Sequence, residues 1–320
     1  MRTSQERDVI FLDFEICSNP SYAEKPTFLY FAQRVQELVD DGCSDYWNKN
    51  RNNKTYIRKM EFDSSNNCIK FLICFNDSTI PSIPVADIDT DEQRNKKLTE
   101  REGEPHTAHL IVKNEAISSN PHIYTGILEE APHLKRRDIE KYFNYLFRLI
   151  RQKYPHEFMQ DSIDGSVDVS GKPRKEGYTN FFDIQGKLSK DFQQMLHDGK
   201  IRALTLVSDQ VATLGCANGS SIQPKRRELT LTALSGKLSL IANALTEACH
   251  IGKKLDYEGL RISFSNGQNL TSSVMINTNT QNVIGDGFTR KERLGDFSLP
   301  LIEAEEDFNT EIVNKMLALL

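Results

Sequence analysis

The sequence lacks the short motifs that identify most enzyme classes. It has no G-x-x-x-x-G-K-[ST] loop for nucleotide phosphates, no G-x-S-x-G turn for a nucleophilic serine and no H-E-x-x-H helix for zinc. Its glycine-bearing stretches, GCANGSS at Gly215–Ser221 and GDGF at Gly285–Phe288, are typical of ordinary loops. We therefore expect a binding protein and not an enzyme, with no cofactor and no metal.

Long hydrophobic runs and paired cysteines are also missing. The apolar runs fall far short of the roughly 20 residues that a membrane-spanning helix requires. The first residues, MRTSQERD, are too polar for a secretory leader. The six cysteines form no C-x-x-C pair, and most lie in apolar or mixed runs, where reduced cysteine acts as a small hydrophobic residue. These absences predict a cytoplasmic protein in a reducing compartment.

Neither sign of charge dominates, because the net charge is −5 for 320 residues. A mildly acidic protein does not coat nucleic acid with its whole surface, but it can carry a local basic face. The charges are unevenly distributed. Residues 135–153 contain seven Lys or Arg and two acids, whereas residues 294–320 contain six acids and one Lys. This asymmetry predicts a basic patch and an acidic patch on one molecule.

Hydrophobic patterns predict an α+β protein of two domains, in which helices pack on antiparallel sheets. A chain of 320 residues exceeds the usual size of one domain. Predicted strand hairpins outnumber strand–helix–strand crossovers, which argues against a parallel sheet. A polar stretch with Gly, Ser and Pro predicts a linker over residues 156–178. We expect it to join an N-terminal α+β domain (1–155) to a C-terminal α+β domain (179–320).

Seven elements are predicted in the N-terminal domain. Apolar residues at spacings of three and four predict two helices, 27–40 with Thr27 as its N-cap and 134–154. Dense or alternating apolar residues predict strands over 8–17, 55–62, 68–75, 109–113 and 122–128. The polar run DSSNN between the second and third of these strands indicates a hairpin.

The same patterns describe the C-terminal domain. Strands are predicted over 201–207, 229–234, 260–264 and 271–277. Helices are predicted from about 189 to 199, over 238–249 with Gly252 as a stop, and over 303–320. Residues 285–296 are expected to form a mixed loop.

Two sets of residues could in principle bind metal. Asp13 and Glu15 lie two residues apart in the first predicted strand, so both carboxylates share one face, as in the first acidic pair of a two-metal exonuclease. No further acidic motif follows at a fitting position, and a solvent-facing pair is the simpler interpretation. His106, His109 and His122 lack the helix and acid of a zinc motif, and a strand would place His106 and His109 on opposite faces.

Basic clusters at the ends of predicted elements are the most informative feature for function. Contacts with phosphates are usually made from such positions. Three cations at a helix start are unfavourable beside the positive end of the helix dipole, and a local cost without a structural gain favours a functional role. For any single cluster, solvated charges that keep the protein soluble are the simpler interpretation. We expect the following residues to bind nucleic acid: Lys135, Arg136, Arg137, Lys141, Lys172, Arg174, Lys175, Lys225, Arg226, Arg227, Lys253, Lys254, Arg290, Lys291 and Arg293.

The order of elements resembles that of phage-exclusion proteins of the RexA type and related phage-defence proteins. The resemblance is carried by HTAHLIVKNEAISSNPHIYTGIL with EEAPHLKRRDIEKYFNYLFR, and by a tail of IRALTLV, a helix, LRISFSNGQNLTSSVMI and EAEEDFNTEIVNKML. It implies an intracellular homodimer that binds DNA with little sequence preference in antiviral defence, with a membrane-protein or phage-protein partner. No single residue is carried over, because no motif matches position by position.

Three function classes therefore stay open. The first is nucleic-acid binding by the basic clusters, with DNA as the expected ligand. The second is a protein–protein adaptor that docks through the acidic C-terminal helix. The third is a metal-dependent nuclease that uses Asp13 and Glu15.

Overall fold

The computed structural model describes the chain as two units, each built on its own antiparallel sheet. The first unit contains Met1–Ile184 and Glu292–Leu320, and the second contains Gln185–Lys291. Helices pack on both sheets, so the predicted α+β class is confirmed. The structure describes residues 5–79, 82–86, 93–97, 99, 102–118, 120–163, 165–167, 170–187, 189, 201–208, 226–231, 241–265, 271–278 and 289–320.

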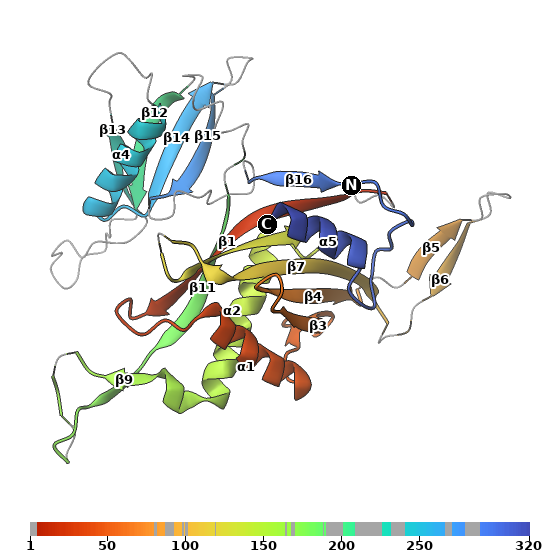
Figure 1. Ribbon diagram of the computed structural model, residues 1–320, viewed down its shortest axis with the longest axis horizontal. Coiled ribbons are helices and arrows are strands. Elements are labelled where there is room, and N and C mark those ends of the chain that lie inside the picture. Colours follow the sequence, from red (N-terminus) through yellow and green to blue (C-terminus); the bar gives the residue numbers. More distant parts are fainter. Residues whose placement is uncertain are drawn as a thin grey trace. The chain divides into compact units, whose positions relative to one another are not determined.

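An eight-stranded sheet forms the framework of the first unit (Figure 1). Its order is β11–β1–β8–β7–β4–β3–β2, and β16 also pairs with β1. The strands are β1 (Arg7–Asn19), β2 (Tyr46–Trp47), β3 (Asn53–Asp63), β4 (Cys68–Asp77), β7 (Glu104–Ala116), β8 (Ile123–Glu129), β11 (Thr179–Gly186) and β16 (Lys291–Leu294). A separate two-stranded hairpin, β5 (Ser82–Ala86) and β6 (Gln93–Lys97), is inserted between β4 and β7.

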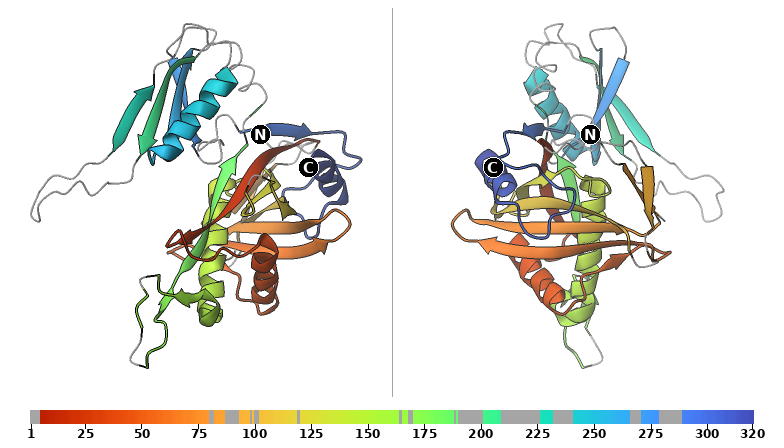
Figure 2. Two further views of the ribbon diagram at one scale, coloured as in Figure 1. Left: turned by 60° about the vertical axis from the view of Figure 1, so that its left-hand side comes forward. Right: turned by 90° about the vertical axis from the view of Figure 1, so that its right-hand side faces the viewer.

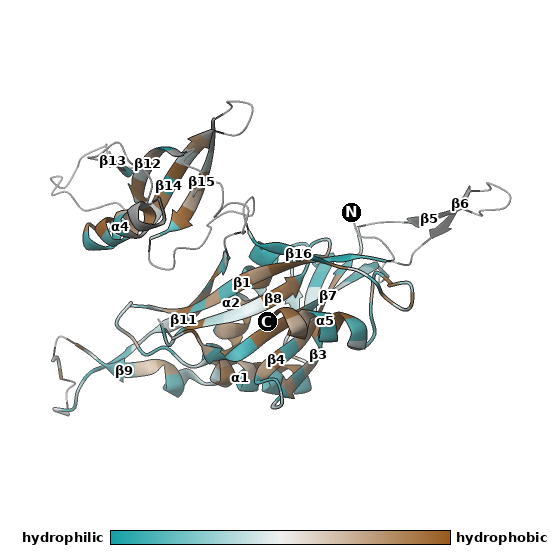
Figure 3. Cartoon of the chain, turned by 45° about the horizontal axis from the view of Figure 1, so that its top comes forward, coloured by the Kyte–Doolittle hydropathy of each residue, from teal (hydrophilic) through white to brown (hydrophobic). Residues whose placement is uncertain are grey.

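Both faces of this sheet are covered, as the two views of Figure 2 show. The helices of the unit are α1 (Phe28–Asp40), α2 (Arg136–Lys153), the 3-10 helix η1 (Pro155–Phe158) and α5 (Thr310–Leu319). Leu12 and Phe14 of β1 belong to the core that contains α1 and α2. Val9 and Phe11 pack with α5 on the opposite face. Because β1 is buried on both sides, its apolar residues include the unbroken run Val9–Leu12 and do not simply alternate with polar ones. Figure 3 shows much of this strand in brown.

Local sequence signals explain several element ends. Thr27 is the N-cap of α1, as predicted, and its Oγ1 accepts a hydrogen bond from the Tyr30 N–H at 3.1 Å. The predicted hairpin between β3 and β4 is confirmed, with Asp63 paired with Cys68 at its closed end. The predicted pairing of strands 260–264 and 271–277 is confirmed in the second unit, where they are β14 (Gly259–Ser265) and β15 (Thr271–Asn277).

A four-stranded sheet with the order β13–β12–β14–β15 forms the second unit. Its elements are β12 (Ile201–Ser208), β13 (Arg227–Leu231), α4 (Ile241–Lys254), β14 (Gly259–Ser265) and β15 (Thr271–Asn277). Leu206, Ile262 and Ile276 of the sheet pack with Ala248 and Cys249 of α4. The expected helix from about 189 to 199 lies almost entirely outside the described residues.

The predicted domain boundary differs from the observed one. Residues 156–178 do not separate the units but form η1 and the hairpin of β9 (Met159–Asp161) and β10 (Lys175–Gly177) in the first unit. Residues 292–320 also belong to the first unit, where Ile312 and Met316 are buried. The polar composition of this stretch therefore reflects an exposed hairpin, seen at the lower left of Figure 1, and not a linker.

Three further predicted bounds are wrong. Helix α4 continues through Gly252, where an added Cβ would lie 2.7 Å from Thr278, so this glycine permits close packing and does not end the helix. Residues 291–294 form β16 inside the predicted loop. Helix α5 begins at Thr310, because residues 303–309 follow a bent path that is hydrogen-bonded to Thr107 and His109 of β7. Among the described residues, no helix has the length and apolar character needed to cross a membrane.

A candidate nucleic-acid interface

Helix α2 carries a row of positive charges on its exposed side. Its buried face, which includes Ile139, Phe143, Leu146 and Ile150, fixes the orientation of the helix on the sheet. At 3.6 residues per turn, four exposed cations lie within roughly 80° of one another and extend over about 21 Å of the helix axis. We call these four residues the α2 ridge: Arg137, Lys141, Arg148 and Arg151.

The charges of the α2 ridge are not neutralised by ion pairs. Within the ranges that the structure describes, none of the four forms an ion pair with a carboxylate, whereas Lys153 beside them binds Asp41 at 2.5 Å. The acid nearest to the ridge on the helix is Glu140, which is half-buried. Burial raises its pKa, Asp183 raises it further, and Arg136 and Arg137 oppose the shift. The ridge therefore offers cations to an external anion.

Arg136 is not part of this surface, contrary to the prediction. Its side chain is buried, and Nη1 donates a hydrogen bond to the Ile184 carbonyl of β11 at 2.5 Å. The same atom lies 3.7 Å from Glu140. The predicted run of three cations is thus divided: Lys135 is the exposed N-cap residue, Arg136 joins α2 to the sheet, and Arg137 faces solvent.

A second basic surface, which the sequence reasoning missed, lies at the edge of the sheet. Residues 46–60 contain five Lys or Arg and no acid. We call Tyr46–Arg58, which contains β2 and the start of β3, the basic hairpin. The Asn48 side chain orders its loop, since Oδ1 accepts hydrogen bonds from the backbone N–H groups of Asn52 at 3.1 Å and Asn53 at 3.3 Å. Lys49 and Arg51 are exposed in this loop.

The basic hairpin also holds an exposed aromatic side chain. Trp47 is 46% exposed. The Lys54 ammonium lies 5.6 Å from the centre of the Trp47 ring, 4.5 Å from that of Tyr56 and 2.6 Å from the Asp45 carboxylate. The signal that could have revealed this surface is the long run of cations without an acid, which the Asn-rich turn pattern obscured.

The α2 ridge and the basic hairpin are in contact through tyrosines. The Arg148 guanidinium lies 5.6 Å from the centre of the Tyr145 ring. Tyr145 in turn packs on Tyr46 with ring centres 5.0 Å apart, and its hydroxyl donates to the Asp45 carbonyl at 2.9 Å. The two basic surfaces therefore form one continuous region of the first unit.

One other predicted cluster, and Arg293 from another, lie in the first unit. Lys172, Arg174 and Lys175 are exposed on the β9–β10 hairpin, where Lys175 is 2.7 Å from Asp161. The root of this hairpin is beside the α2 ridge, because a Cβ at Gly177 would lie 3.4 Å from Arg151 Nη2. Arg293 is instead neutralised at the start of β1: its Nε is 2.9 Å from Asp8 and its Nη1 is 3.3 Å from Glu6.

The remaining predicted cations belong to the second unit. Arg226 Nε is 3.1 Å from Glu228, and Arg227 Nη2 donates to the Asp256 carbonyl at 2.9 Å. This contact brings Arg227 to the end of α4, where Lys253 and Lys254 are exposed. The backbone N–H of Arg290 donates to the Lys187 carbonyl at 2.6 Å, and Lys291 begins β16. Lys225 lies outside the described residues.

The candidate metal ligands are occupied in other ways. Asp13 is buried, contrary to the expected solvent exposure, and its Oδ1 accepts a hydrogen bond from the Thr125 hydroxyl at 3.1 Å. Glu15 is half-buried. Burial of the Cys17 thiol and, to a smaller extent, the negative charge of Glu15 raise the pKa of Cys17 to about 12. His106 and His109 face opposite sides of β7, as predicted. In the described part of the chain, no three His, Cys, Asp or Glu residues are placed to hold a metal.

A buried polar network fixes the acidic C-terminal segment to the sheet. The N–H of Asn309, the N-cap residue of α5, donates to His109 Nε2 at 3.0 Å. Nδ1 of that imidazole therefore carries the proton and donates to Glu129 at 2.7 Å. Arg7 lies 3.1 Å from the other oxygen of Glu129. Because the apolar face of α5 is also buried, docking of a partner at this segment would have to use the exposed acids that precede the helix, Glu303, Glu306 and Asp307.

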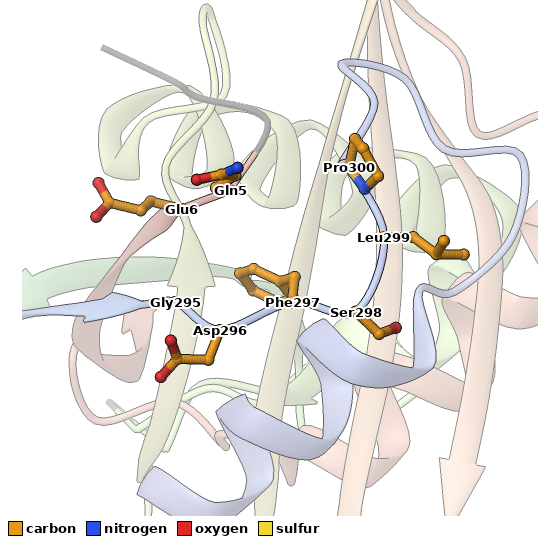
Figure 4. A pocket seen from close by; sticks show the side chains of 8 residues that line it. All are labelled: Gln5, Glu6, Gly295, Asp296, Phe297, Ser298, Leu299 and Pro300. Carbon is orange, nitrogen blue, oxygen red and sulfur yellow. The ribbon is translucent and has the colours of Figure 1, made fainter.

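An open hollow of about 450 Å³ lies beside the start of β1 (Figure 4). Glu6 and Asp296 contribute carboxylates to its rim, and Arg293 is engaged by Glu6. Such a lining does not suit a phosphate group. Its lining residues are Gln5, Glu6, Gly295, Asp296, Phe297, Ser298, Leu299 and Pro300.

No protein-family model matches the chain, and no curated protein matches it. The resemblance to phage-exclusion proteins of the RexA type therefore stays a prediction.

Proposed function

We propose that the protein binds nucleic acid, with DNA as the expected ligand, through phosphate contacts made by the α2 ridge. The observation that supports this proposal is the alignment of Arg137, Lys141, Arg148 and Arg151 on one exposed helix face, with no ion pair to any described residue. Charges that serve only solubility need not be aligned. A polyanion gains from such a row, because each cation that neutralises a phosphate releases condensed counterions.

The chemistry of the ridge favours weak sequence preference. Reading of base edges uses bidentate groups such as the amide of Asn, which pairs with adenine. The amide within the ridge belongs to Asn144, and it is already used: Nδ2 donates to the Phe182 carbonyl at 3.1 Å, and Oδ1 accepts from the Phe182 N–H at 2.6 Å. The other side chains of the ridge are Lys and Arg. Their contacts with phosphates position the backbone and carry no sequence information, whereas only an Arg or Lys placed in the major groove would read guanine.

The test is fluorescence anisotropy with labelled random-sequence DNA duplexes at about 50 mM salt. We expect the wild type to bind, and Arg148→Gln with Arg151→Gln to weaken binding to every sequence by a similar factor, on the order of a hundredfold at this salt concentration. The fold should be retained, because exposed charges contribute little to stability.

The matched control is Lys253→Gln with Lys254→Gln. These residues are exposed in the last turn of α4 in the second unit, and the change removes the same charge. We expect this variant to bind as the wild type does. No binding by the wild type at low salt, or equal weakening by both double variants, would contradict the proposal that the α2 ridge is the interface.

An antiviral role, which the resemblance implies, is a separate proposal that depends on this surface. Cells that express the wild type should reduce phage plating, and cells that express the Arg148→Gln and Arg151→Gln variant at equal abundance should not. Equal protection by both proteins would separate any antiviral activity from the α2 ridge.

A further inference from the structure

We infer that the basic hairpin is a stacking site for unpaired bases, so that the interface takes single-stranded nucleic acid in preference to duplex. This inference rests on the proposed function, because the α2 ridge supplies the phosphate contacts beside the stacking site. It adds a binding site at Trp47 and the class of ligand that this site accepts.

Trp47 is exposed, whereas its neighbour Tyr46 packs against the core. In β2, the edge strand of the described sheet, Tyr46 faces the core and packs on Tyr145. Because side chains alternate along a strand, Trp47 lies on the opposite face of the sheet from Tyr46. Its partner in β3 is Lys54, and Tyr56, two residues further along β3, lies on the same face as Trp47. The indole is 46% exposed at this position. An aromatic ring presented beside a second ring at a sheet edge is the type of platform on which bases stack.

Cations surround the two rings. Lys54 lies between them, 5.6 Å and 4.5 Å from the ring centres. Arg58 donates a hydrogen bond to the Tyr56 hydroxyl at 3.2 Å, which holds its guanidinium next to the second ring. Lys49 and Arg51 project from the loop, and in the described structure neither has an ion-pair partner. Bases on the rings would therefore have cations within reach of their phosphates on either side.

The contact between the two surfaces gives a strand a continuous path. Arg148 of the ridge contacts Tyr145, Tyr145 packs on Tyr46, and Trp47 is the next residue. A strand bound along the ridge has to bend round the sheet edge to reach Trp47. A flexible single strand can do so and can expose its bases. A duplex keeps its bases paired inside and bends little over such a distance, since its persistence length is about 150 base pairs.

The experiment uses the fact that Trp47 is the only tryptophan of the chain. Fluorescence excited at wavelengths that tryptophan absorbs and the ten tyrosines do not therefore reports this side chain alone. Anisotropy of a labelled oligonucleotide reports total binding in the same titration. The ligands are an oligothymidine of about 15 nucleotides and a duplex of equal length at low salt. We expect the single strand to quench Trp47 and the duplex to leave it unchanged. Trp47→Ala should weaken single-strand binding about tenfold and leave duplex binding unchanged.

Two further variants protect the test from a folding artefact. Lys49→Gln with Arg51→Gln keeps Trp47 and should weaken binding of the single strand more than that of the duplex. Tyr22→Ala removes another exposed aromatic side chain, 54% exposed and outside the basic hairpin, and should change neither affinity.

The possible failures are distinguishable. Binding of both ligands by anisotropy, with unchanged Trp47 fluorescence and equal affinities, would overturn the stacking site and leave the proposed function intact. An anisotropy signal for neither ligand at low salt would overturn both proposals. Quenching by the single strand, with weaker binding of both ligands to the Arg148→Gln and Arg151→Gln variant, would support both.

Discussion

Arg136 and Arg137 are neighbours in the chain, but their environments give them different roles. Arg136 is buried and donates to the Ile184 carbonyl of β11, whereas Arg137 is exposed on the α2 ridge. An arginine that satisfies a buried carbonyl cannot leave it for a ligand without exposing an unpaired group to a low-dielectric environment. The structural gain from Arg136 also offsets its unfavourable place at the positive end of the helix dipole.

This difference leads to opposite expectations for two chemically equal substitutions. Arg136→Gln should lower the free energy of unfolding by about 2 to 4 kcal/mol, because it removes the partner of a buried carbonyl and of Glu140. Arg137→Gln should change it by less than about 0.5 kcal/mol and should weaken DNA binding instead. Urea unfolding at pH 7 measures the first effect and anisotropy the second. Equal stability of the two variants would contradict the role given to Arg136.

At the scale of elements, the turn between β3 and β4 depends on one carboxylate. Asp63 accepts hydrogen bonds from Lys70 Nζ at 2.7 Å, from the Asn66 side chain at 2.8 Å and backbone N–H at 3.0 Å, and from the Ser65 hydroxyl at 2.8 Å. These bonds, with that from Lys70 first, hold the pKa of Asp63 well below its ordinary range. The charged form therefore fastens the closed end of the hairpin.

The lowered pKa fixes how this stabilisation depends on pH. It is fully present above the unfolded pKa of about 4 and is lost as pH falls toward the lower folded pKa. Asp63→Asn should lower the free energy of unfolding at pH 7 by about 1 to 3 kcal/mol. The difference from the wild type should shrink when unfolding is measured near pH 3. A difference that stays constant between the two pH values would show that the charge of Asp63 is not responsible.

Sequence reasoning succeeded for elements whose causes are local. The Thr27 cap, the β3–β4 turn and the apolar face of α2 all depend on residues a few positions apart. The start of α5 was wrong because residues 303–309 follow β7 through bonds to Thr107 and His109, about 200 positions away in the chain. Contacts at such separations leave no periodic pattern in the sequence.

The residues of the candidate interface were predictable only where they are close to one another in the sequence. Arg137 and Lys141 were found because they lie near a dense basic cluster. Arg148 and Arg151 were not selected, since they are isolated in sequence and join the row only when the helix is wound. The burial of Arg136 depends on Ile184, 48 positions away, and was beyond any local pattern.

At the scale of the whole molecule, the first unit is closed by both ends of the chain. Strand β1 lies inside its sheet, and α5 from the far end of the sequence covers that strand. Ile312, Val313 and Met316 are buried there, and Asn309 joins the network of His109 and Glu129. The second unit is thus an insertion into the sequence of the first.

A truncation after Leu301 should therefore unfold the first unit. It removes three buried side chains, each worth about 2 to 5 kcal/mol, from a domain whose total stability is typically about 5 to 15 kcal/mol. Differential scanning calorimetry should show the loss of a cooperative transition. Leu299→Ala is the control, because this side chain is 73% exposed and its removal should change little. A truncated chain that melts like the wild type would show that α5 is dispensable for the fold.

The net charge of −5 and the cationic α2 ridge together predict how duplex binding responds to salt. The overall charge repels DNA, but at about 0.1 M salt charges more than roughly 10 Å from the contact are largely screened, so the ridge dominates at short range. Four phosphate contacts give a slope of log affinity against log salt of about −3.6, so affinity should fall about 150-fold between 50 and 200 mM. With Arg148 and Arg151 changed to Gln, two contacts are left and the fall should be only about tenfold.

Anisotropy titrations of both proteins across this range measure the two slopes. Equal slopes would mean that the bound phosphates lie elsewhere, whereas a slope reduced by about 2 would assign two of the contacts to these arginines.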